Sequence, residues 1–599
     1  MRKYVWSVMI LLTAFNSFAQ PGFIEKRLAQ LSRRSDNAKA EADSLVQLYG
    51  DMLKEMKPTN ASFVYGFKAY DGRWNDISSQ ASLRNKAWYQ QILAAAKKIN
   101  KNNLSKTGAL YVSLIENSAS EGVQQIEYNL DLMPIDQMNG LHKTIVSVIN
   151  GLPINSPKDA ENVLTMLAGI DQFIEQILSV LRDGVSKGIV PAKITIAPVF
   201  DQIKAIIQDT VSKSPFYNNF VNLRFSSDAA TKAILQQKAK DIIAKQINPA
   251  YQKLLNYIQS DYYPKCRDNV SVSSLPQGKE MYQFLVRSYT STNLTAEEIH
   301  QLGLTEVKRI LGEMARIREK SGFKGSEREF NAFLRTDPRF YYTSAADLVE
   351  GYRDIAKRID PELINLFGKL PRLPYGVKPV PDYAAPSQPT AYYMSGSQQQ
   401  ARPGYFYANT YDLKSRPKWE MEALTLHEAV PGHHLQIALE GELTQPDFLK
   451  FLSVTAFTEG WGLYAESLGE QIGLYQDIYS KYGQLTYELW RAIRLVIDTG
   501  IHCYGWSRED AINYFSENSP KPLKDIQVEV DRYIAFPGQA VSYKIGQLKI
   551  SDLKQKAQKT LGANFNIRDF HDVVLGSGSI PLTLLEENVN AWIAEHKKL

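Results

Sequence analysis

Hydrophobic residues recur along most of this chain with the three- and four-residue spacing of amphipathic helices. The clearest stripe follows alternating four- and three-residue steps on one helix face and consists of Val163, Leu167, Ile170, Ile174, Ile177 and Leu181. Prolines punctuate such stretches at Pro134, Pro153, Pro191 and Pro215. The pattern predicts helices from about Pro21 to Lys265. Another helix is predicted after Thr295, a suitable N-cap, with Glu298 at the capping-box position.

The pattern changes over residues 370–412, where prolines, glycines and tyrosines cluster. Within this stretch, residues Tyr405–Tyr411 have the composition of a short strand. The segment from Ser415 to Pro417 predicts the start of a helix, because proline suits the first helical turn. We therefore expect a mainly α protein, a large helical fold with a small β-sheet beside a histidine-rich helix.

Size and charge limit the possible classes of protein. The chain has 599 residues, of which 44% are hydrophobic and 22% are charged, as in an ordinary globular protein. Its formal charge of +5, or +3 without Arg2 and Lys3, is too small and dispersed to indicate a nucleic-acid partner. We expect an N-terminal helical region over residues 20–285 and a catalytic region over residues 286–599, joined in one continuous body.

The N-terminus is typical of a secretory signal peptide. A positive start at Arg2-Lys3 precedes an apolar run over residues 5–15 and a small-x-small ending at Ala19. The run is shorter than the ~20 residues that a spanning helix needs. We expect cleavage after Ala19 and export as a soluble protein to a bacterial periplasm, without stable membrane insertion. Export permits a disulfide between Cys266 and Cys503, although two separate thiols fit the sequence equally well.

Three of the eight histidines lie within the octapeptide that starts at His427 and Glu428. A His-Glu pair followed by another histidine is how a helix presents two zinc ligands and a general base. The position four residues after His427, which shares its helix face, is Pro431, which cannot bind a metal and breaks a helix.

Two later histidines compete for the role of second ligand. His434 shares the face of His427 but lies roughly 10 Å away on an intact helix. If Pro431 and Gly432 loop out, His433 takes the place of the missing ligand. We predict His427 and His433 as zinc ligands, with His434 as the alternative. A helix end with incidental histidines is the remaining interpretation.

A third ligand is expected from the helix predicted around residues 458–466. Its apolar stripe consists of Val454, Phe457, Trp461, Tyr464 and Leu468, so this helix packs into the core. A buried carboxylate is costly unless it is paired or binds a metal, which favours Glu459 as the ligand. Glu466 is equally well explained as an exposed helix acid.

Arg491, Arg494, Asp498 and His502 share one helix face. They form either a salt-bridged surface stripe or a functional group in which Asp498 orients His502 towards a developing oxyanion. Their apolar neighbours favour burial and hence the functional interpretation.

A second polar group follows, with Arg532, Tyr533 and Tyr543. The Tyr533 hydroxyl is a candidate for stabilising a tetrahedral intermediate. Arg532 or Arg494 is a candidate for holding a substrate carboxylate with its planar fork, although ordinary packed or ion-paired side chains explain these residues too.

Several of these segments resemble the bacterial family called domain of unknown function 885. They read HEAVPGHHLQ, TEGWGLYAE, RLVIDTGIHCYGW and DRYIAFPGQAVSYKIGQ, with weaker matches at YYPKCR, LTAEEIHQLGL and GYFYANTYD. This resemblance, which covers nearly all of the chain after the signal peptide, implies a gluzincin-like zinc metallopeptidase fold. It implies His427 and His433 as ligands and Glu428 as the base, because the position of His434 can also be tyrosine in that family. The run at Glu459 is similar to the Glu-Gly-Phe run that carries the third gluzincin ligand.

The sequence thus predicts a secreted zinc metallopeptidase that hydrolyses peptide bonds and, if an arginine holds the terminal carboxylate, acts as a carboxypeptidase or dipeptidase on short peptides. Substrate would lie against the strand that contains Tyr405 and Asn409, pairing along its edge, and near Tyr543. A zinc amidohydrolase acting on non-peptide or cell-wall amides is one alternative. The other is an inactive periplasmic binding protein with a structural or vestigial zinc site. The sequence leaves the oligomeric state open.

Overall fold

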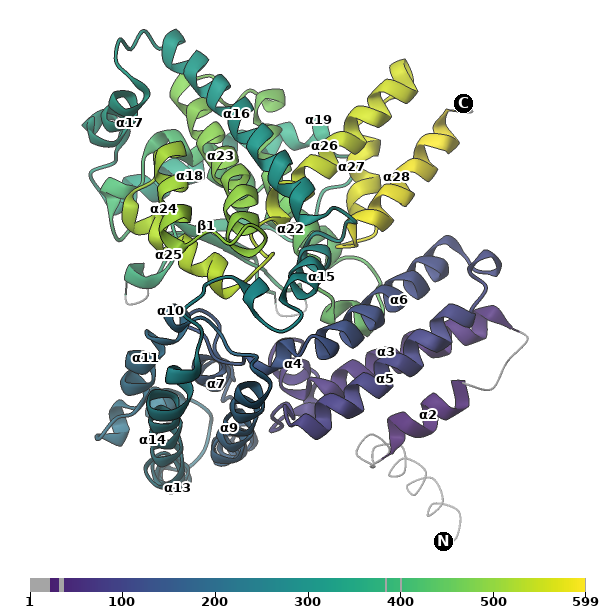
Figure 1. Cartoon of the computed structure of the whole chain (residues 1–599), viewed down its shortest axis with the longest axis vertical. Coiled ribbons are helices and arrows are strands. Elements are labelled where there is room, and N and C mark those ends of the chain that lie inside the picture. The colour runs from purple at the N-terminus through teal and green to yellow at the C-terminus, as the bar shows by residue number, and fades with distance from the viewer. Residues whose placement is uncertain (1–21, 32–36, 383–384, 399–400, 598–599) are drawn as a thin grey trace. The chain divides into compact units, whose positions relative to one another are not determined.

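The computed structural model of the protein describes residues 22–31, 37–382, 385–398 and 401–597 (Figure 1). The predicted signal peptide, residues 1–19, lies outside the described residues. Helices dominate the described chain and three short strands form one sheet, which confirms the mainly α prediction. The chain divides into two compact units, the first comprising residues 1–268 and 445–452 and the second residues 269–444 and 453–599.

Unit 1 is built from helices, and its described residues contain no β-strand. Its α-helices are α2 (Phe23–Leu31), α3 (Ala38–Met56), α4 (Pro58–Phe63), α5 (Ser79–Lys98), α6 (Lys106–Glu127), α7 (Leu141–Gly151), α8 (Pro157–Ala168), α9 (Ile170–Lys187), α10 (Lys193–Ile196), α11 (Val199–Ile206), α12 (Asn218–Val221), α13 (Ala229–Ile242) and α14 (Asn248–Tyr257).

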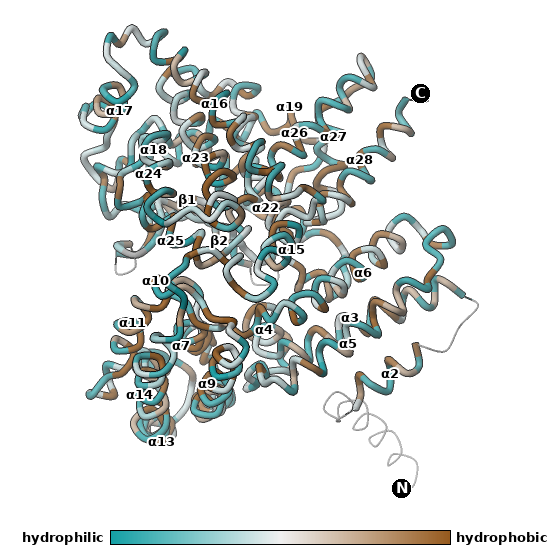
Figure 2. Tube along the Cα trace, in the orientation of Figure 1, coloured by the Kyte–Doolittle hydropathy of each residue, from teal (hydrophilic) through white to brown (hydrophobic). Residues whose placement is uncertain are grey.

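The apolar stripe predicted from the sequence runs through α8 and α9, which meet at Gly169, and all six of its residues are buried in the core of this unit. The hydrophobic positions of α9 can be followed along its tube in Figure 2. Residues 157–187 are the one described segment long and apolar enough to cross a membrane by length and composition, but 56% of its most apolar window is buried inside the protein. A core helix passes the same test, so this segment is weak evidence for a membrane span.

Unit 2 contains the remaining helices and the sheet. Its α-helices are α15 (Gly278–Thr290), α16 (Ala296–Lys320), α17 (Glu327–Thr336), α18 (Ala345–Ile359), α19 (Leu363–Leu366), α20 (Met421–Glu428), α21 (His433–Glu440), α22 (Thr455–Ser467), α23 (Ile478–His502), α24 (Arg508–Asn518), α25 (Leu523–Ala535), α26 (Ser542–Leu561), α27 (Ile567–Leu575) and α28 (Leu582–His596). The capping box predicted at Thr295 and Glu298 opens α16.

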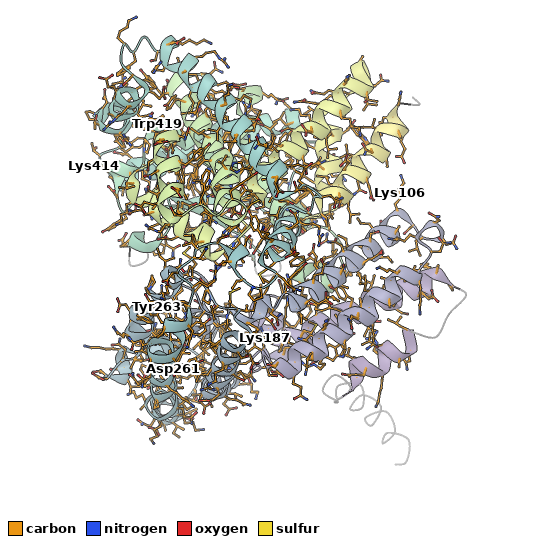
Figure 3. The ribbon with its side chains drawn as sticks, viewed as in Figure 1. Lys106, Lys187, Asp261, Tyr263, Lys414 and Trp419 are labelled. Carbon is orange, nitrogen blue, oxygen red and sulfur yellow. The ribbon has the colours of Figure 1, made fainter. Side chains whose placement is uncertain are left out.

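Helix α23 is the centre of unit 2. It runs beside α16 (Figure 1), also packs against α20, α22, α25 and α26, and is buried along nearly its whole length. Trp419, labelled in Figure 3, is buried just before α20 and packs edge-on against Tyr482 of α23. Gly483 lies directly against this segment, because a Cβ atom there would come within 1.8 Å of the Trp419 carbonyl oxygen. The helix with the histidines is thereby fixed on α23.

The sheet has the order β1-β3-β2, from strands β1 (Tyr375–Pro379), β2 (Ala391–Met394) and β3 (Gly404–Ala408). Strand β3 pairs in parallel with β1 and antiparallel with β2, so both of its edges are occupied. The prediction that a substrate pairs along the edge of this strand is therefore wrong. The strand also ends at Ala408, short of the predicted Tyr411.

The structure also bears on two other local predictions, the helix start at Ser415 and the pairing of the two cysteines. A 3-10 turn over Lys418–Glu420 follows Pro417, and the α-helix begins only at Met421, later than the predicted start at Ser415. Cys266 and Cys503 are both free thiols in the structure.

Candidate metal centre

The histidine-rich segment is a break between two helices. Helix α20 ends at Glu428 and α21 begins at His433, with a cis peptide bond between Val430 and Pro431 in the connection. The returning chain passes so close to the end of α20 that a Cβ atom at Gly432 would lie 1.9 Å from the carbonyl oxygen of His427. Only glycine permits this approach. The Pro-Gly step therefore interrupts the helix, as the sequence predicted.

This break brings His427 and His433 to the same carboxylate. The Nε2 atoms of His427 and His433 lie 3.6 Å and 3.7 Å from Oε2 of Glu459, which projects from α22. The two imidazole rings are nearly perpendicular, with centroids 4.7 Å apart. One ligand atom from each of the three residues lies within 4.8 Å of the other two.

The chemistry and spacing of this group fit a zinc ion. Zinc binds imidazole nitrogen and carboxylate oxygen at about 2.0–2.2 Å in a tetrahedral arrangement, so neighbouring ligand atoms are roughly 3.3 Å apart. The separations from Glu459 exceed this value by a few tenths of an ångström. Glu459 is also the more accessible side of the group, because 24% of its side chain is exposed against 3% for His427. Three protein ligands with one accessible side match a catalytic rather than a closed structural zinc site.

A fourth residue, Glu466, supports His427 from behind. Its carboxylate is completely buried and accepts a hydrogen bond from Nδ1 of His427 at 2.8 Å. This contact directs Nε2 of His427 towards Glu459, the usual arrangement of a metal-binding histidine and its carboxylate partner. This role of Glu466 is not predicted from the sequence, which explains the residue equally well as an exposed helix acid. The signal was present, since Glu459 and Glu466 lie seven residues, or two helical turns, apart.

The pKa values of the candidate ligands show how their charges compensate one another without a metal. Burial lowers the pKa of His427, but the carboxylates of Glu459 and Glu466 outweigh burial and raise it to about 9. Burial opposes ionisation of Glu459, but the neighbouring histidines and Arg491 lower its pKa to about 2. Burial and the nearby charge of His427 lower the pKa of His433 below its usual value. A protonated His427 thus neutralises the carboxylates where a metal cation would do so.

Glu428 ends α20 next to His427, and its side chain is half-buried. Within the part of the chain that the structure describes, its carboxylate has no hydrogen bond or ion pair to another residue. A carboxylate beside the ligands that is free to accept a proton is what a general base requires.

His434, the alternative ligand, lies away from this group. Its Nδ1 is 2.9 Å from the Tyr393 hydroxyl and its Nε2 is 3.1 Å from the Leu373 carbonyl oxygen, both on the side of the sheet. Burial lowers its pKa to about 4, so the ring is neutral. Both of its nitrogens are already used, and the structure places His433, not His434, beside Glu459.

The stripe on α23 is buried, not a surface stripe: Arg491, Arg494, Asp498 and His502 are at most 6% exposed. His502 nevertheless has a structural role. Its Nδ1 accepts a hydrogen bond from the Val272 amide, and its Nε2 donates to the Tyr533 carbonyl oxygen. Because both nitrogens bind backbone groups, the prediction that His502 donates to a substrate oxyanion is wrong.

Asp498 does not serve a substrate either. It accepts hydrogen bonds from the Tyr282 hydroxyl at 2.6 Å and from the Gly538 amide at 2.9 Å. Its burial raises its pKa to about 7.

Tyr533 is likewise engaged within the protein. Its hydroxyl donates to Glu529 at 2.7 Å and accepts from Arg494 at 3.1 Å. The prediction that this hydroxyl stabilises a tetrahedral intermediate is therefore wrong, because its proton is committed to Glu529. Arg532 binds the same glutamate at 3.2 Å. Tyr543 is a better candidate, since burial and then the charge of Glu459 raise its pKa, which places it near the ligand group.

The two residues predicted on the tyrosine-rich strand have other contacts. Asn409 is buried and donates to the carbonyl oxygens of Ala385, Gln388 and Pro389, so it organises its own loop. Its predicted role in substrate binding is wrong for this reason. The ring of Tyr405 lies 3.6 Å beneath the Lys378 ammonium group.

A cavity of 530 Å³ beside α18 is lined by residues such as Asp347, Arg358 and Glu422 and includes none of the three candidate ligands.

Comparisons with known proteins identify relatives but no activity. A family model described as a bacterial protein of unknown function (DUF885) matches residues 58–589. A solved protein from Colwellia psychrerythraea, described as a candidate lipoprotein, is 28% identical with a TM-score of 0.87 and covers 94% of this chain and 100% of its own. A candidate lipoprotein of unknown function from Shewanella oneidensis is 18% identical with a TM-score of 0.73, covers 91% of this chain and 99% of its own, and shows the shared fold. No curated protein matches the chain.

Proposed function

This chain belongs to the DUF885 family of bacterial proteins of unknown function, and we propose that it is a zinc-dependent hydrolase that cleaves peptide bonds. The observation that carries the proposal is the grouping of His427, His433 and Glu459 around one point, with the unpartnered carboxylate of Glu428 beside them. In this proposal the ligand set is gluzincin-like, with two histidines from an interrupted helix and a glutamate from a following helix.

The three ligands and their support define what the protein contributes. Zinc, when bound, would act as a Lewis acid on the scissile carbonyl and lower the pKa of water to about 7. His427 and His433 would hold the ion through Nε2, and Glu466 would keep the His427 ring in the required tautomer.

Glu428 and Tyr543 complete the proposed chemistry. Glu428 takes a proton from the attacking water and returns it to the leaving amine, which needs a carboxylate not committed elsewhere. Tyr543, which replaces Tyr533 and His502 in this role, donates its hydroxyl proton to the developing oxyanion. The ring of Tyr543 is held by the Arg494 guanidinium, which lies 4.4 Å from its centroid.

A purely structural zinc site explains the geometry less well. Structural sites are closed by four protein ligands, whereas only three candidate ligands meet in the described chain. A structural site also needs no base, which would leave the position of Glu428 without a purpose.

The deciding experiment compares zinc-loaded wild type with Glu428→Gln on a peptide library. We expect the variant to keep its zinc and its melting temperature while kcat falls by roughly 10²–10⁴-fold. Glu422→Gln, the same change on the same helix, should retain activity because Glu422 binds Arg358 and the Tyr475 amide instead. Equal hydrolysis by Glu428→Gln and wild type would refute the assigned base, and zinc-loaded wild type that cleaves no peptide would refute the function.

We also propose export. The support is the predicted signal peptide and the description of the two structural relatives as candidate lipoproteins. Mass spectrometry of the periplasmic protein should show an N-terminus at Gln20, and an uncleaved cytoplasmic chain would contradict export.

A further inference from the structure

Three arginines, Arg491, Arg494 and Arg532, lie near the proposed catalytic centre, and two of them share a single carboxylate. Arg494 and Arg532 each donate to Oε2 of Glu529, at 3.1 Å and 3.2 Å. Burial opposes ionisation of Glu529, but these two arginines lower its pKa to about 2. Glu529 is therefore an ionised partner fully used by two guanidinium groups. The sequence had offered Arg494 and Arg532 for a substrate carboxylate, but the structure pairs both internally.

Arg491 differs from its two neighbours. It is only 6% exposed, yet no carboxylate lies within ion-pair distance of it among the described residues. Its Nη1 donates to the carbonyl oxygen of Tyr487 at 3.3 Å, one turn earlier on α23. Its Nε is buried and has no hydrogen-bond partner. Nη2 carries no hydrogen bond to the described protein either.

The remaining donors of Arg491 have the geometry of an anion site. Nε–H and Nη2–H form one edge of the planar guanidinium, the fork that binds a carboxylate through two parallel hydrogen bonds. The Tyr487 and Trp490 rings, with centroids 4.8 Å and 5.0 Å away, hold the plane in place. A buried charge without a counterion is costly, and stacking on aromatic rings offsets only part of that cost. A ligand with a negative charge would offset the rest.

Arg491 also lies within electrostatic reach of the ligand group. Helix α23 packs against α20 and α22, which contribute the candidate ligands. The pKa of Glu459 is raised by burial and lowered by His427, by His433 and then by Arg491. The Arg491 charge also contributes, after burial and His427, to lowering the pKa of His433.

We infer that Arg491 binds a carboxylate group of the substrate beside the scissile bond, so that the enzyme is selective for peptides carrying a negative charge there. The inference rests on the proposed hydrolase function for its substrate. Two sources supply such a carboxylate: the C-terminus of the peptide, which makes the protein an exopeptidase, or an acidic side chain near the cleavage point. Arg494 and Arg532 keep Glu529 and position the surrounding tyrosines.

The test measures binding separately from cleavage. Three pools of N-acetylated tetrapeptides are used: neutral residues with a free C-terminus, the same peptides as C-terminal amides, and amides with glutamate as the last residue. Zinc-loaded Glu428→Gln protein is dialysed to equilibrium with each pool, and retained peptides are counted by mass spectrometry. We expect the free acids or the glutamate amides to be retained and the neutral amides not, which also identifies the source of the carboxylate.

Variants at position 491 then locate the contact. Arg491→Gln in the Glu428→Gln background should weaken retention of the preferred pool by roughly 10- to 100-fold, and Arg491→Lys should restore part of it. Arg339→Gln is the matched control, because Arg339 also stacks on aromatic rings, at 4.6 Å from Phe340, but contacts none of these residues. Melting temperatures establish that each variant is folded, and the comparison of pools needs no change at position 491.

The outcomes separate this inference from the proposed function. Equal retention of all three pools, or unchanged retention by folded Arg491→Gln, overturns the inference. Cleavage of the neutral amides by wild type as fast as the charged pools overturns it while the hydrolase function stands. Carboxylate-selective retention that depends on Arg491, with no cleavage by wild type, overturns the function and leaves Arg491 as a binding residue.

Discussion

Two polar clusters of unit 2 each include a residue of helix α23, with opposite results. In the first, the closed cluster, wholly buried Lys544 lies 2.9 Å from Glu306 and 2.7 Å from Glu488. Arg309 binds the same two carboxylates, at 2.8 Å and 2.5 Å. Burial opposes ionisation of Glu488, but Lys544 and Arg309 lower its pKa to about 2. Each charge in this cluster has a partner from the protein.

The second, the open cluster, consists of the candidate ligands together with Glu428 and Arg491. It lies one helical turn along α23, since Arg491 follows Glu488 by three residues. Here Nε of Arg491 and Nδ1 of His433 are buried without a hydrogen-bond partner. Buried polar groups in proteins are nearly always satisfied, so such exceptions call for an explanation. The comparison teaches that the closed cluster pairs each of its charges within the protein, whereas the open cluster leaves a guanidinium edge and an imidazole nitrogen for a ligand.

The comparison is tested most strongly by removing the cation of the closed cluster. Lys544→Met leaves buried carboxylates short of a counterion and should lower the free energy of unfolding by about 3–5 kcal/mol. Zinc stoichiometry should not change, because Lys544 contacts none of the candidate ligands. Urea denaturation and elemental analysis measure the two effects.

The control for Lys544→Met is Lys549→Met on the same helix. Lys549 forms a partly exposed ion pair with Glu586 at 2.9 Å, which should contribute less than about 1 kcal/mol. If both substitutions lower the free energy of unfolding equally, the closed cluster stabilises the fold no more than an exposed ion pair does.

In the open cluster, Glu466→Gln should weaken zinc binding by about 10- to 100-fold with little effect on the fold. The amide still accepts from Nδ1 of His427, but the charge that favours the metal-binding tautomer is lost. Calorimetric titration with zinc measures the affinity. Glu470→Gln is the control, since Glu470 forms an exposed pair with Lys481 and its side chain is 60% exposed. Unchanged affinity in Glu466→Gln would remove Glu466 from the metal centre.

The smallest expected effect is the change in zinc affinity for each single pH unit. The pKa of His427 in the metal-free protein is about 9, so zinc must displace a proton at neutral pH. Glu459, with a pKa of about 2, is already ionised. Affinity should therefore rise about tenfold per pH unit between pH 6 and 8 and level off near pH 9. Competition with a chromophoric chelator measures this slope, and a flat profile would mean that His427 is neutral before zinc arrives.

Local patterns were sufficient for the helices, the capping box at Thr295 and the break at Pro431 and Gly432. Each depends on residues within a few positions of one another, and spacing and backbone restrictions act directly at that range. The same local reasoning favoured His433 over His434 as the partner of His427, because the break at Pro431 and Gly432 displaces the chain by about that much. It was less reliable at element ends, where α20 begins after a 3-10 turn that no composition signal marked.

What the sequence determined by itself was the helical class and which residues share a face of one helix. Only the tertiary structure decided which of those residues find partners: Glu466 behind His427, Glu529 between Arg494 and Arg532, and backbone groups around His502. The physical reason is that a carboxylate or guanidinium is equally compatible with many partners, and the helix packing that brings one of them within 3 Å involves residues far apart in the sequence.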